Sequence, residues 1–198
     1  MDITQEPINH LSICAGIDGI GRGLQNIFPN CRTIAHCEIE DYIAALLVAK
    51  MEANKIHPAP IFSDLSTFPF KTFRGMVSIL SAGFPCQPFS VAGLRQGKDD
   101  DRHLWPEMLR VIRECQPRWV IGENVSGFIR MALDDVCADL EREGYEVRTF
   151  VLPACAVDAR HRRDRVWIVG YTSSEYRRRD TDGRRSQGLE VGGHLLEE

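Results

Sequence analysis

The sequence predicts an α/β domain with a largely parallel sheet, because short apolar runs alternate with longer amphipathic stretches along it. Its 198 residues are 43% hydrophobic and 26% charged, which is ordinary for one globular domain and excludes collagen-like, coiled-coil and wholly disordered chains. The formal net charge of -4 argues against a free-standing nucleic-acid binder, because such proteins normally carry a basic surface.

Six apolar runs are predicted strands: 8–14, 33–37, 76–82, 119–123, 146–152 and 166–171. Four amphipathic stretches are predicted helices: 19–28, 41–54, 104–115 and 128–143. The third helix carries its apolar residues on one face and is ended by Pro117. Functional side chains of such a sheet gather at the carboxyl ends of its strands, so a site is expected in the segments that follow them.

Several other classes are disfavoured. No apolar run approaches a membrane span, and residues 1–7 lack the basic region and apolar stretch of a signal peptide, which predicts a cytoplasmic protein without membrane contact. Seven cysteines without a C-x-x-C pair indicate neither a disulfide framework nor a zinc ribbon, so no metal site is expected. Residues 172–198 are polar with little to bury, which predicts a flexible tail after a domain at 1–171.

A glycine-rich turn, Cys14-Ala15-Gly16-Ile17-Asp18-Gly19-Ile20-Gly21, joins the first strand to the first helix. Such a turn lets a ligand approach the backbone and aims helix amides at it. Glu38 ends the second strand 22 residues after Gly16, and an acidic side chain at that offset suits the paired hydroxyls of a ribose. The pattern predicts a nucleoside cofactor without choosing between NAD and S-adenosylmethionine; a turn needed only for helix–sheet packing is the alternative.

Asp64 follows a possible further strand. Its carboxylate would suit the amino group of an adenine, and the alternative is an aspartate that caps a helix.

Cys86 lies just after the 76–82 strand, in Gly83-Phe84-Pro85-Cys86-Gln87-Pro88-Phe89-Ser90. The flanking prolines hold it in a rigid extended turn at the edge of the expected cleft, where a stabilised thiolate would be a nucleophile. Residues 91–102 contain glycines and mixed charge, which is typical of a mobile lid. The ordinary interpretation of a lone cysteine, a small buried apolar residue, is kept for Cys31, Cys115, Cys137 and Cys155.

Two further segments carry charge beside apolar strands. Glu123-Asn124-Val125 ends the 119–123 strand, where desolvation would raise the pKa of Glu123 so that it donates a proton near neutral pH; capping of the next helix is the alternative. Residues 160–165 hold four arginines directly before the last strand, which indicates an anion or base-edge site rather than a solvated charge run.

In this order the segments resemble the DNA (cytosine-5) methyltransferases over about residues 8–171. Residues 83–90 look like the catalytic P-C-Q motif of that family, Glu123-Asn124-Val125 is similar to its E-N-V motif, and Arg163-x-Arg165 to the end of its Q-x-R-x-R motif. The resemblance implies a Rossmann-like methyltransferase fold, with a mostly parallel sheet flanked by helices and incomplete at the C-terminus.

The resemblance also implies a reaction. Cys86 would add to C6 of a cytosine flipped out of double-stranded DNA, Glu123 would protonate or hydrogen-bond N3, Arg165 would contact O2, and Arg163 would support the active-site loop. S-adenosylmethionine would supply the methyl group for C5. The implied cofactor residues are Cys14, Ala15, Gly16, Ile17, Glu38, Ile39, Asp64, Leu65, Pro85 and Leu104. The implied DNA or base contacts are Gln87, Ser90, Arg95 and Asn124.

Four departures from the family pattern stand out. Cys14 replaces an aromatic residue, Asp18 stands where glycine is usual, and His161 replaces the usual Gln. The 27 residues after Tyr171 resemble neither a target-recognition domain nor the motifs that follow it. We therefore expect the catalytic half of such an enzyme, either cut short or split between two chains so that a second polypeptide supplies DNA recognition. A catalytically silent S-adenosylmethionine-binding or protein-interaction module is the alternative, and a nicotinamide-dependent oxidoreductase is a third hypothesis.

Overall fold

The computed structural model describes residues 6–84 and 104–172, which form a seven-stranded sheet flanked by helices. The strands are β1 Ile8–Ile13, β2 Cys31–Cys37, β3 Ile61–Phe62, β4 Ile79–Ala82, β5 Trp119–Val125, β6 Glu146–Pro153 and β7 Asp164–Tyr171. Their order is β3-β2-β1-β4-β5-β7-β6, and β7 pairs antiparallel with both of its neighbours while the other pairs are parallel. The predicted mostly parallel α/β fold is confirmed.

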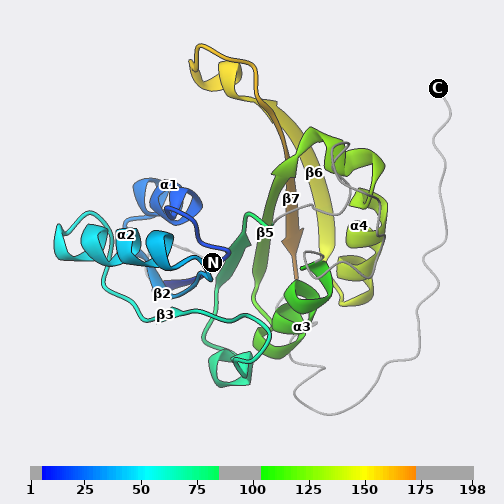
Figure 1. Ribbon diagram of the computed structural model, residues 1–198. Coiled ribbons are helices and arrows are strands. Elements are labelled where there is room, and N and C mark those ends of the chain that lie inside the picture. Colours follow the sequence, from blue (N-terminus) through cyan, green and yellow to red (C-terminus); the bar gives the residue numbers. More distant parts are fainter. Residues whose placement is uncertain (1–5, 85–103, 173–198) are drawn as a thin grey trace, which may run out of the picture.

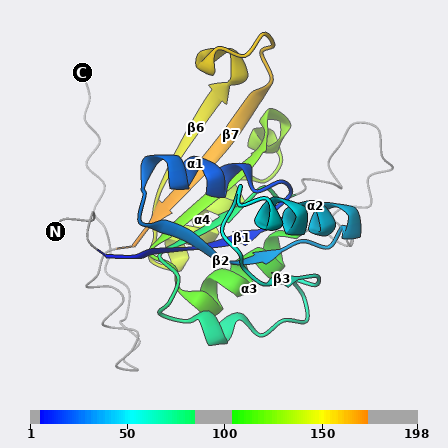
Figure 2. The same ribbon diagram turned by 90° about the vertical axis from the view of Figure 1, so that its left-hand side faces the viewer.

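The α-helices are α1 Gly19–Ile27, α2 Asp41–Glu52, α3 Trp105–Cys115 and α4 Leu133–Arg142, and the short 3-10 turns are η1 Phe70–Phe73, η3 Ser126–Arg130 and η4 Ala154–Val157. Helices α1 and α2 lie on one side of the sheet, and α3 and α4 lie on the other (Figure 1). Figure 2 shows α1 and α2 in front of the sheet, with the β6–β7 hairpin extending beyond them and carrying η4 at its tip.

Most predicted boundaries differ from the structure by one or two residues, and two differ by more, for identifiable reasons. The strand predicted at 76–82 begins at Ile79, because Gly75 adopts a left-handed φ of +77° and the chain turns there. The helix predicted at 128–143 is divided into η3 and α4, because Ala132 leaves the helical conformation with φ -153°. Thr172 apart, the predicted tail lies outside the described residues.

The side of the sheet under α3, α4 and η1, here called the closed face, holds the main core. Alternate residues of the central strands point into it, among them Leu11, Leu80, Val120 and Ile168, each at most 3% exposed. Trp105 of α3 donates its indole N–H to Asp139 Oδ2 of α4 at 2.7 Å, which joins the two helices over this face.

The other side, here called the open face, has a smaller core. Leu24 of α1 packs there with Cys31 and Ile79, and partly buried neighbours surround them. Helix α1 starts where Asp18 adopts the left-handed conformation, with φ 57° and ψ 45°. Within the described ranges, no helix is both long enough and apolar enough to cross a membrane.

Candidate active site

The parallel strands β1, β2, β4 and β5 end at the same edge of the sheet, so the segments that follow them meet there. The chain order reverses between β1 and β4: β1 leads to α1 on the open face, and β4 precedes α3 on the closed face. Ligands of open α/β sheets bind at such a reversal, outside the carboxyl ends of the strands. The predicted site is therefore located where the topology favours one.

The glycine turn after β1 and the carboxylate after β2 are in direct contact. Glu38, which is 8% exposed, accepts a hydrogen bond from the Gly16 N–H at 2.8 Å and another from the Glu40 N–H at 3.0 Å. The turn is tight, because Cys14 and Gly16 both have left-handed φ angles, of 47° and 52°. The two parts of the cofactor pattern, 22 residues apart in sequence, thus form one structural unit.

The residues around this unit fit a nucleoside-containing cofactor. No atom lies within 4 Å of the point where a Cβ on Gly16 would be, so the backbone of the turn is open to a ligand. A carboxylate has about four lone-pair positions, so Glu38 keeps acceptor capacity for hydroxyl groups after its two backbone bonds. Ile39, beside it, is 72% exposed and offers an apolar surface for a flat ring.

A cavity of about 660 Å³ begins at this edge of the sheet. Cys14, Ala15, Gly83 and Glu123 line its end at the carboxyl termini of the strands, and the rest runs along α1 over the open face. Burial raises the pKa of the Cys14 thiol to about 12, so this side chain is neutral near pH 7. The cavity connects the glycine turn with the predicted acid of the E-N-V segment.

Glu123 of the E-N-V segment and Arg165 of the Arg163-x-Arg165 segment form an ion pair that the sequence did not predict. Arg165 Nε lies 2.7 Å from Glu123 Oε1, with 23% and 26% of the two side chains exposed. The contact exists because β5 pairs antiparallel with β7, which places Arg165 beside the carboxyl end of β5. The desolvation of Glu123 expected from its apolar strand is therefore partial, and an arginine compensates its charge.

Gly83 and Asn124 hold the start of the P-C-Q segment against this pair. A Cβ on Gly83 would lie 3.5 Å from Glu123 Oε2, so the carboxylate lies over this glycine. Asn124, 4% exposed, donates from Nδ2 to the Phe84 carbonyl at 3.0 Å, and its Oδ1 accepts from the Val125 N–H at 2.9 Å. Asn124 is thus buried and holds the backbone at Phe84, and its contact with a base stays a prediction.

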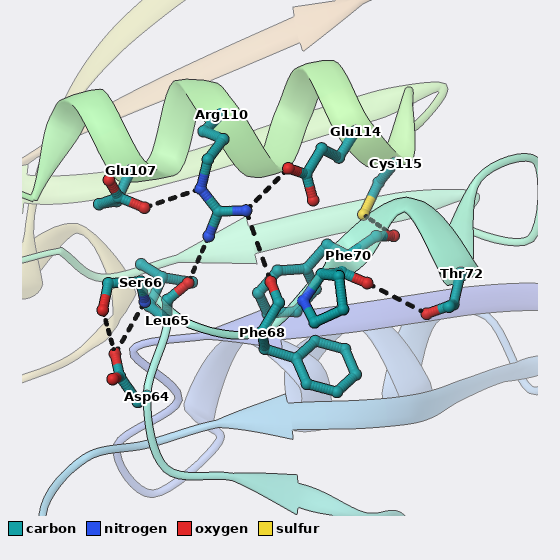
Figure 3. A network of polar contacts seen from close by, with 11 residues as sticks. Asp64, Leu65, Ser66, Phe68, Phe70, Thr72, Glu107, Arg110, Glu114 and Cys115 are labelled. Atoms are coloured by element: carbon teal, nitrogen blue, oxygen red, sulfur yellow. Dashed lines mark hydrogen bonds and ion pairs between the residues drawn. The ribbon is translucent and has the colours of Figure 1, made fainter.

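Asp64 caps a local turn. Its Oδ1 accepts from the hydroxyl of Ser66 at 2.7 Å and from the Ser66 N–H at 2.8 Å, and these bonds hold the pKa of Asp64 below its usual value (Figure 3). Residues 65–67 form a turn rather than a helix, so Asp64 is not the helix cap of the alternative, and a bond to an adenine stays a prediction.

Arg110 of α3 anchors the segment that carries Asp64 and the buried Leu65. Its guanidinium pairs with Glu107 and Glu114, each at 2.8 Å, and donates to the carbonyls of Leu65 and Phe68 (Figure 3). Because Leu104 directly precedes α3, this network fixes two predicted parts of the cofactor site relative to each other.

Asp18 is an unexpected feature beneath the turn. It is 1% exposed, accepts from the Ser12 hydroxyl at 3.1 Å, and its Oδ2 has no partner among the described residues. Burial raises its pKa to about 6. The left-handed backbone explains why glycine suits this position, and aspartate is one of the few other residues that tolerate it.

The remaining arginines are not brought to the pair. Arg163 is exposed with a left-handed φ of 34°, and Arg162, also exposed, pairs with Asp164 at 3.1 Å. They belong to the β6–β7 connection, which the Ala154 N–H closes by donating to the Arg162 carbonyl at 2.6 Å. Of the two predicted catalytic arginines, the structure joins Arg165 to Glu123 and leaves Arg163 apart.

Five predicted site residues lie outside the described part of the chain: Pro85, Cys86, Gln87, Ser90 and Arg95. The predicted lid at 91–102 lies outside it as well. Among residues 6–84 and 104–172, no group of three His, Cys, Asp or Glu side chains is placed to hold a metal ion.

Sequence reasoning missed two contributors. Trp167 lines the cavity. It could have been predicted there, because Trp167 and Arg165 are two residues apart and so lie on the same face of β7. Arg110 was overlooked although Glu107 and Glu114 flank it at helical spacing, which predicts a paired arginine.

Comparisons with known proteins agree with this architecture. The family model of the C-5 cytosine-specific DNA methylases matches residues 8–190. The Type II methyltransferase M.NlaX of Neisseria lactamica is 31% identical over 170 residues, which are 83% of this chain and 52% of that protein. M.AplI of Arthrospira platensis is 35% identical over 167 residues, with 83% and 46% covered.

Solved structures show the same fold. The Dnmt2 methyltransferase of S. pombe superposes with a TM-score of 0.67 at 20% identity, over 83% of this chain and 51% of that one. The Entamoeba histolytica methyltransferase EhMeth gives 0.69 at 17% identity, over 85% and 54%. The chain thus spans about half the length of these proteins.

Proposed function

Because the chain belongs to the family of C-5 cytosine-specific DNA methylases, we propose that it carries the catalytic half of an enzyme that methylates C5 of cytosine in double-stranded DNA. The Type II relatives favour a place in restriction-modification, in the cytoplasm of a bacterial cell. The observation that carries the proposal is the Glu123–Arg165 pair, which joins two family motifs over Gly83, at the start of the third.

The proposed chemistry begins with the base. C5 of cytosine is a weak nucleophile, and its ring edge is inaccessible in stacked DNA, so the base must leave the helix. The Cys86 thiolate would add to C6 while Glu123 protonates or hydrogen-bonds N3, which makes C5 electron-rich. Arg165 would hold O2 of the base beside Glu123, and Arg163 would support the loop. Loss of the C5 proton after methylation would then expel the cysteine.

Bound S-adenosylmethionine would supply the methyl group from its sulfonium. Glu38 would accept from the ribose hydroxyls, Ile39 would pack on the adenine, and the Gly16 turn would let the ligand approach the backbone. Arg110 would keep the Asp64–Leu65 segment against the start of α3, where Leu104 lies. The open backbone at Gly16 and the buried carboxylate of Glu38 support this arrangement.

The partner proposal concerns DNA recognition. The chain spans 52% of M.NlaX and 46% of M.AplI. Each of these relatives therefore contains a further segment about as long as the matched one. We propose that an additional polypeptide segment supplies target recognition and that transfer without it is weak.

The experiment uses DNA that contains 5-fluorocytosine. Fluorine at C5 leaves no proton to remove, so an enzyme that follows this route remains covalently attached to the base. With S-adenosylmethionine and the unmatched part of M.NlaX co-expressed, we expect a protein–DNA adduct for the wild type and for Cys155→Ser, whose cysteine is exposed at the hairpin tip. Cys86→Ser should form none. An adduct that survives in Cys86→Ser would refute the mechanism.

The alternative is a silent module that binds S-adenosylmethionine without catalysis. Calorimetry together with the adduct assay separates the two. A silent module would bind S-adenosylmethionine but give no adduct, with or without the co-expressed part of M.NlaX. Binding of NAD in place of S-adenosylmethionine would favour the oxidoreductase hypothesis instead.

A further inference from the structure

Asp18 is a buried carboxylate that forms no ion pair with any residue in the described ranges. Its side chain is enclosed under α1, with 1% of the residue exposed. Oδ1 accepts from the Ser12 hydroxyl at 3.1 Å, whereas Oδ2 has no hydrogen-bond partner there. Burial of a carboxylate without a full set of partners costs stability, so its presence calls for an explanation.

The local backbone fixes where this carboxylate lies. Asp18 has the left-handed angles φ 57° and ψ 45°, and its side chain makes no capping hydrogen bond to the first turn of α1. It lies instead against Gly21, where a Cβ would be 2.4 Å from Asp18 Oδ1. Glycine at position 21 therefore leaves the space that the carboxylate occupies, and the two residues form a matched pair.

The carboxylate lies directly behind the wall of the proposed cofactor site. Ile17 and Gly19, the chain neighbours of Asp18, line the cavity, and so does its hydrogen-bond partner Ser12. Lys50 of α2 reaches the same wall, but its ammonium donates to the Ile17 carbonyl at 2.5 Å. The negative charge of Asp18 is therefore one residue away from the surface that a cofactor would contact, and no guanidinium or ammonium is paired with it.

The groups that face Asp18 come from four elements. From α2, the positive charge of Lys50 lowers the pKa of Asp18, and from β1 the Ser12 hydroxyl does the same. From β2 comes Cys31, whose thiol stays neutral because its pKa is raised to about 11. On α1, Arg22 is exposed and contacts Asp18 through its backbone N–H. Burial outweighs these effects and raises the pKa of Asp18 to about 6, so the group is a buried anion at pH 8.

A buried anion beside this wall distinguishes ligands by charge. S-adenosylmethionine carries a positive sulfonium, whereas S-adenosylhomocysteine, which remains after methyl transfer, has a neutral thioether at the same atom. Coulomb attraction to a nearby cation is strengthened where water is excluded. Because Asp18 is 1% exposed before any ligand binds, binding removes little further water from it. The attraction between carboxylate and sulfonium therefore decides the sign of the effect.

We propose that Asp18 is a specificity-determining residue of the cofactor site, whose buried carboxylate favours the sulfonium of S-adenosylmethionine over the neutral S-adenosylhomocysteine. The inference rests on the cofactor part of the proposed function. Asp18 acts through its field, from behind the turn, and not through contact with the reacting atoms. Its consequence is that the product is held less tightly than the cofactor, which favours exchange of one for the other after transfer.

The test is calorimetry of the full chain with S-adenosylmethionine and with S-adenosylhomocysteine, at pH 5 and pH 8. Asp18→Asn removes the charge, keeps the shape and tolerates the left-handed backbone. At pH 8 we expect the variant to bind S-adenosylmethionine about fivefold more weakly or worse, and S-adenosylhomocysteine within about twofold of the wild type.

The pH dependence has a definite sign. A cation favours the ionised carboxylate, so the wild-type preference for S-adenosylmethionine should increase as pH rises through the pKa of Asp18, near 6. The preference of Asp18→Asn should be the same at pH 5 and pH 8. The ratio of the two affinities cancels the amino and carboxyl groups that both ligands share.

Asp135→Asn is the matched control, because it makes the same change at an exposed position of α4, on the other side of the sheet. Both of its affinities should equal those of the wild type. Equal weakening of both ligands by Asp18→Asn would assign Asp18 to support of the turn and overturn the proposal. An unchanged preference in that variant would overturn it too. A wild type that binds neither ligand would overturn the cofactor proposal, and this one with it.

Discussion

The two faces of the sheet present different side chains from the same strands. Toward the closed face β1 and β4 present Leu11 and Leu80, which are fully buried. Toward the open face the same strands present His10, Ser12 and Ser81, which form polar contacts under α1. The alternation of a strand therefore separates two tasks: one face stabilises the domain, and the other supplies the polar edge of the site and one wall of the cavity.

The polar side chains of the open face are buried, so each of them needs a hydrogen-bond partner inside the protein. His10 lies 2.9 Å from the Thr33 hydroxyl through Nδ1 and 2.7 Å from the Ser81 hydroxyl through Nε2. Burial lowers the pKa of His10 to about 3 and that of His36 to about 4. These imidazoles are neutral at physiological pH, so His10 is held by hydrogen bonds between neutral groups, whereas neither ring nitrogen of His36 has a hydrogen-bond partner among the described residues.

The largest expected effect compares the faces directly. Leu80→Ala should lower the free energy of unfolding by about 2–5 kcal/mol, because it leaves a cavity in the closed-face core. Leu152→Ala removes the same atoms from a side chain that is 51% exposed and should cost less than about 1 kcal/mol. Urea unfolding of both variants measures the difference. Equal losses would show that the open face is as well covered as the closed one.

A pH-dependent effect should follow from Asp18 beneath the glycine turn. Its folded pKa of about 6 lies above the unfolded value near 3.8, so its contribution is fully present below pH 3.8 and is lost as pH rises through 6. Asp18→Asn removes that loss. The variant should therefore gain on the order of 2 kcal/mol relative to the wild type between pH 4 and pH 8.

Unfolding measured at both pH values tests this, and subtraction of the wild type removes the contribution of the histidines. A difference that is the same at pH 4 and pH 8 would mean that Asp18 is ionised in the fold without cost.

A smaller effect concerns the contacts that Arg110 of α3 makes with two glutamates and two backbone carbonyls. Arg110→Ala should cost about 1–2 kcal/mol, because two glutamates and two carbonyls lose a charged donor. Arg113→Ala, on the same helix, breaks an ion pair whose arginine is 51% exposed and should cost less than 1 kcal/mol. Thermal unfolding ranks the two. Affinity for S-adenosylmethionine should fall for Arg110→Ala alone, since Arg113 does not contact the Leu65 segment.

The smallest expected effect on stability accompanies the largest on chemistry. Glu123→Gln breaks a partly exposed ion pair and should change the free energy of unfolding by less than about 1 kcal/mol. Methyl transfer by the chain with its partner segment should fall about 100-fold or more, as expected for loss of a proton donor. Radiolabelled methyl transfer and urea unfolding together test whether Glu123 affects catalysis without affecting stability. Loss of stability and activity in parallel would contradict it.

Most of the fold was predictable because short apolar runs alternate regularly with longer amphipathic stretches. The offset between Gly16 and Glu38 and the order of the motifs identified these residues, but the Glu38–Gly16 and Glu123–Arg165 contacts were not predicted and come from the structure. The missed features depend on three-dimensional context. The break at Ala132 is a backbone change inside a helical pattern, and the burial of Asp18 depends on the left-handed turn above it. The cavity along α1 depends on which elements cover the open face, and no local sequence pattern reports that.

The insertion of β7 between β5 and β6 also determines when the domain can form during synthesis. Until the segment Asp164–Tyr171 has left the ribosome, β5 is an unpaired sheet edge and Glu123 has no guanidinium beside it. The last described strand is therefore the one that closes the sheet and completes the ion pair. A nascent chain that ends before β7 would keep most of the closed-face core but leave one edge of β5 unpaired.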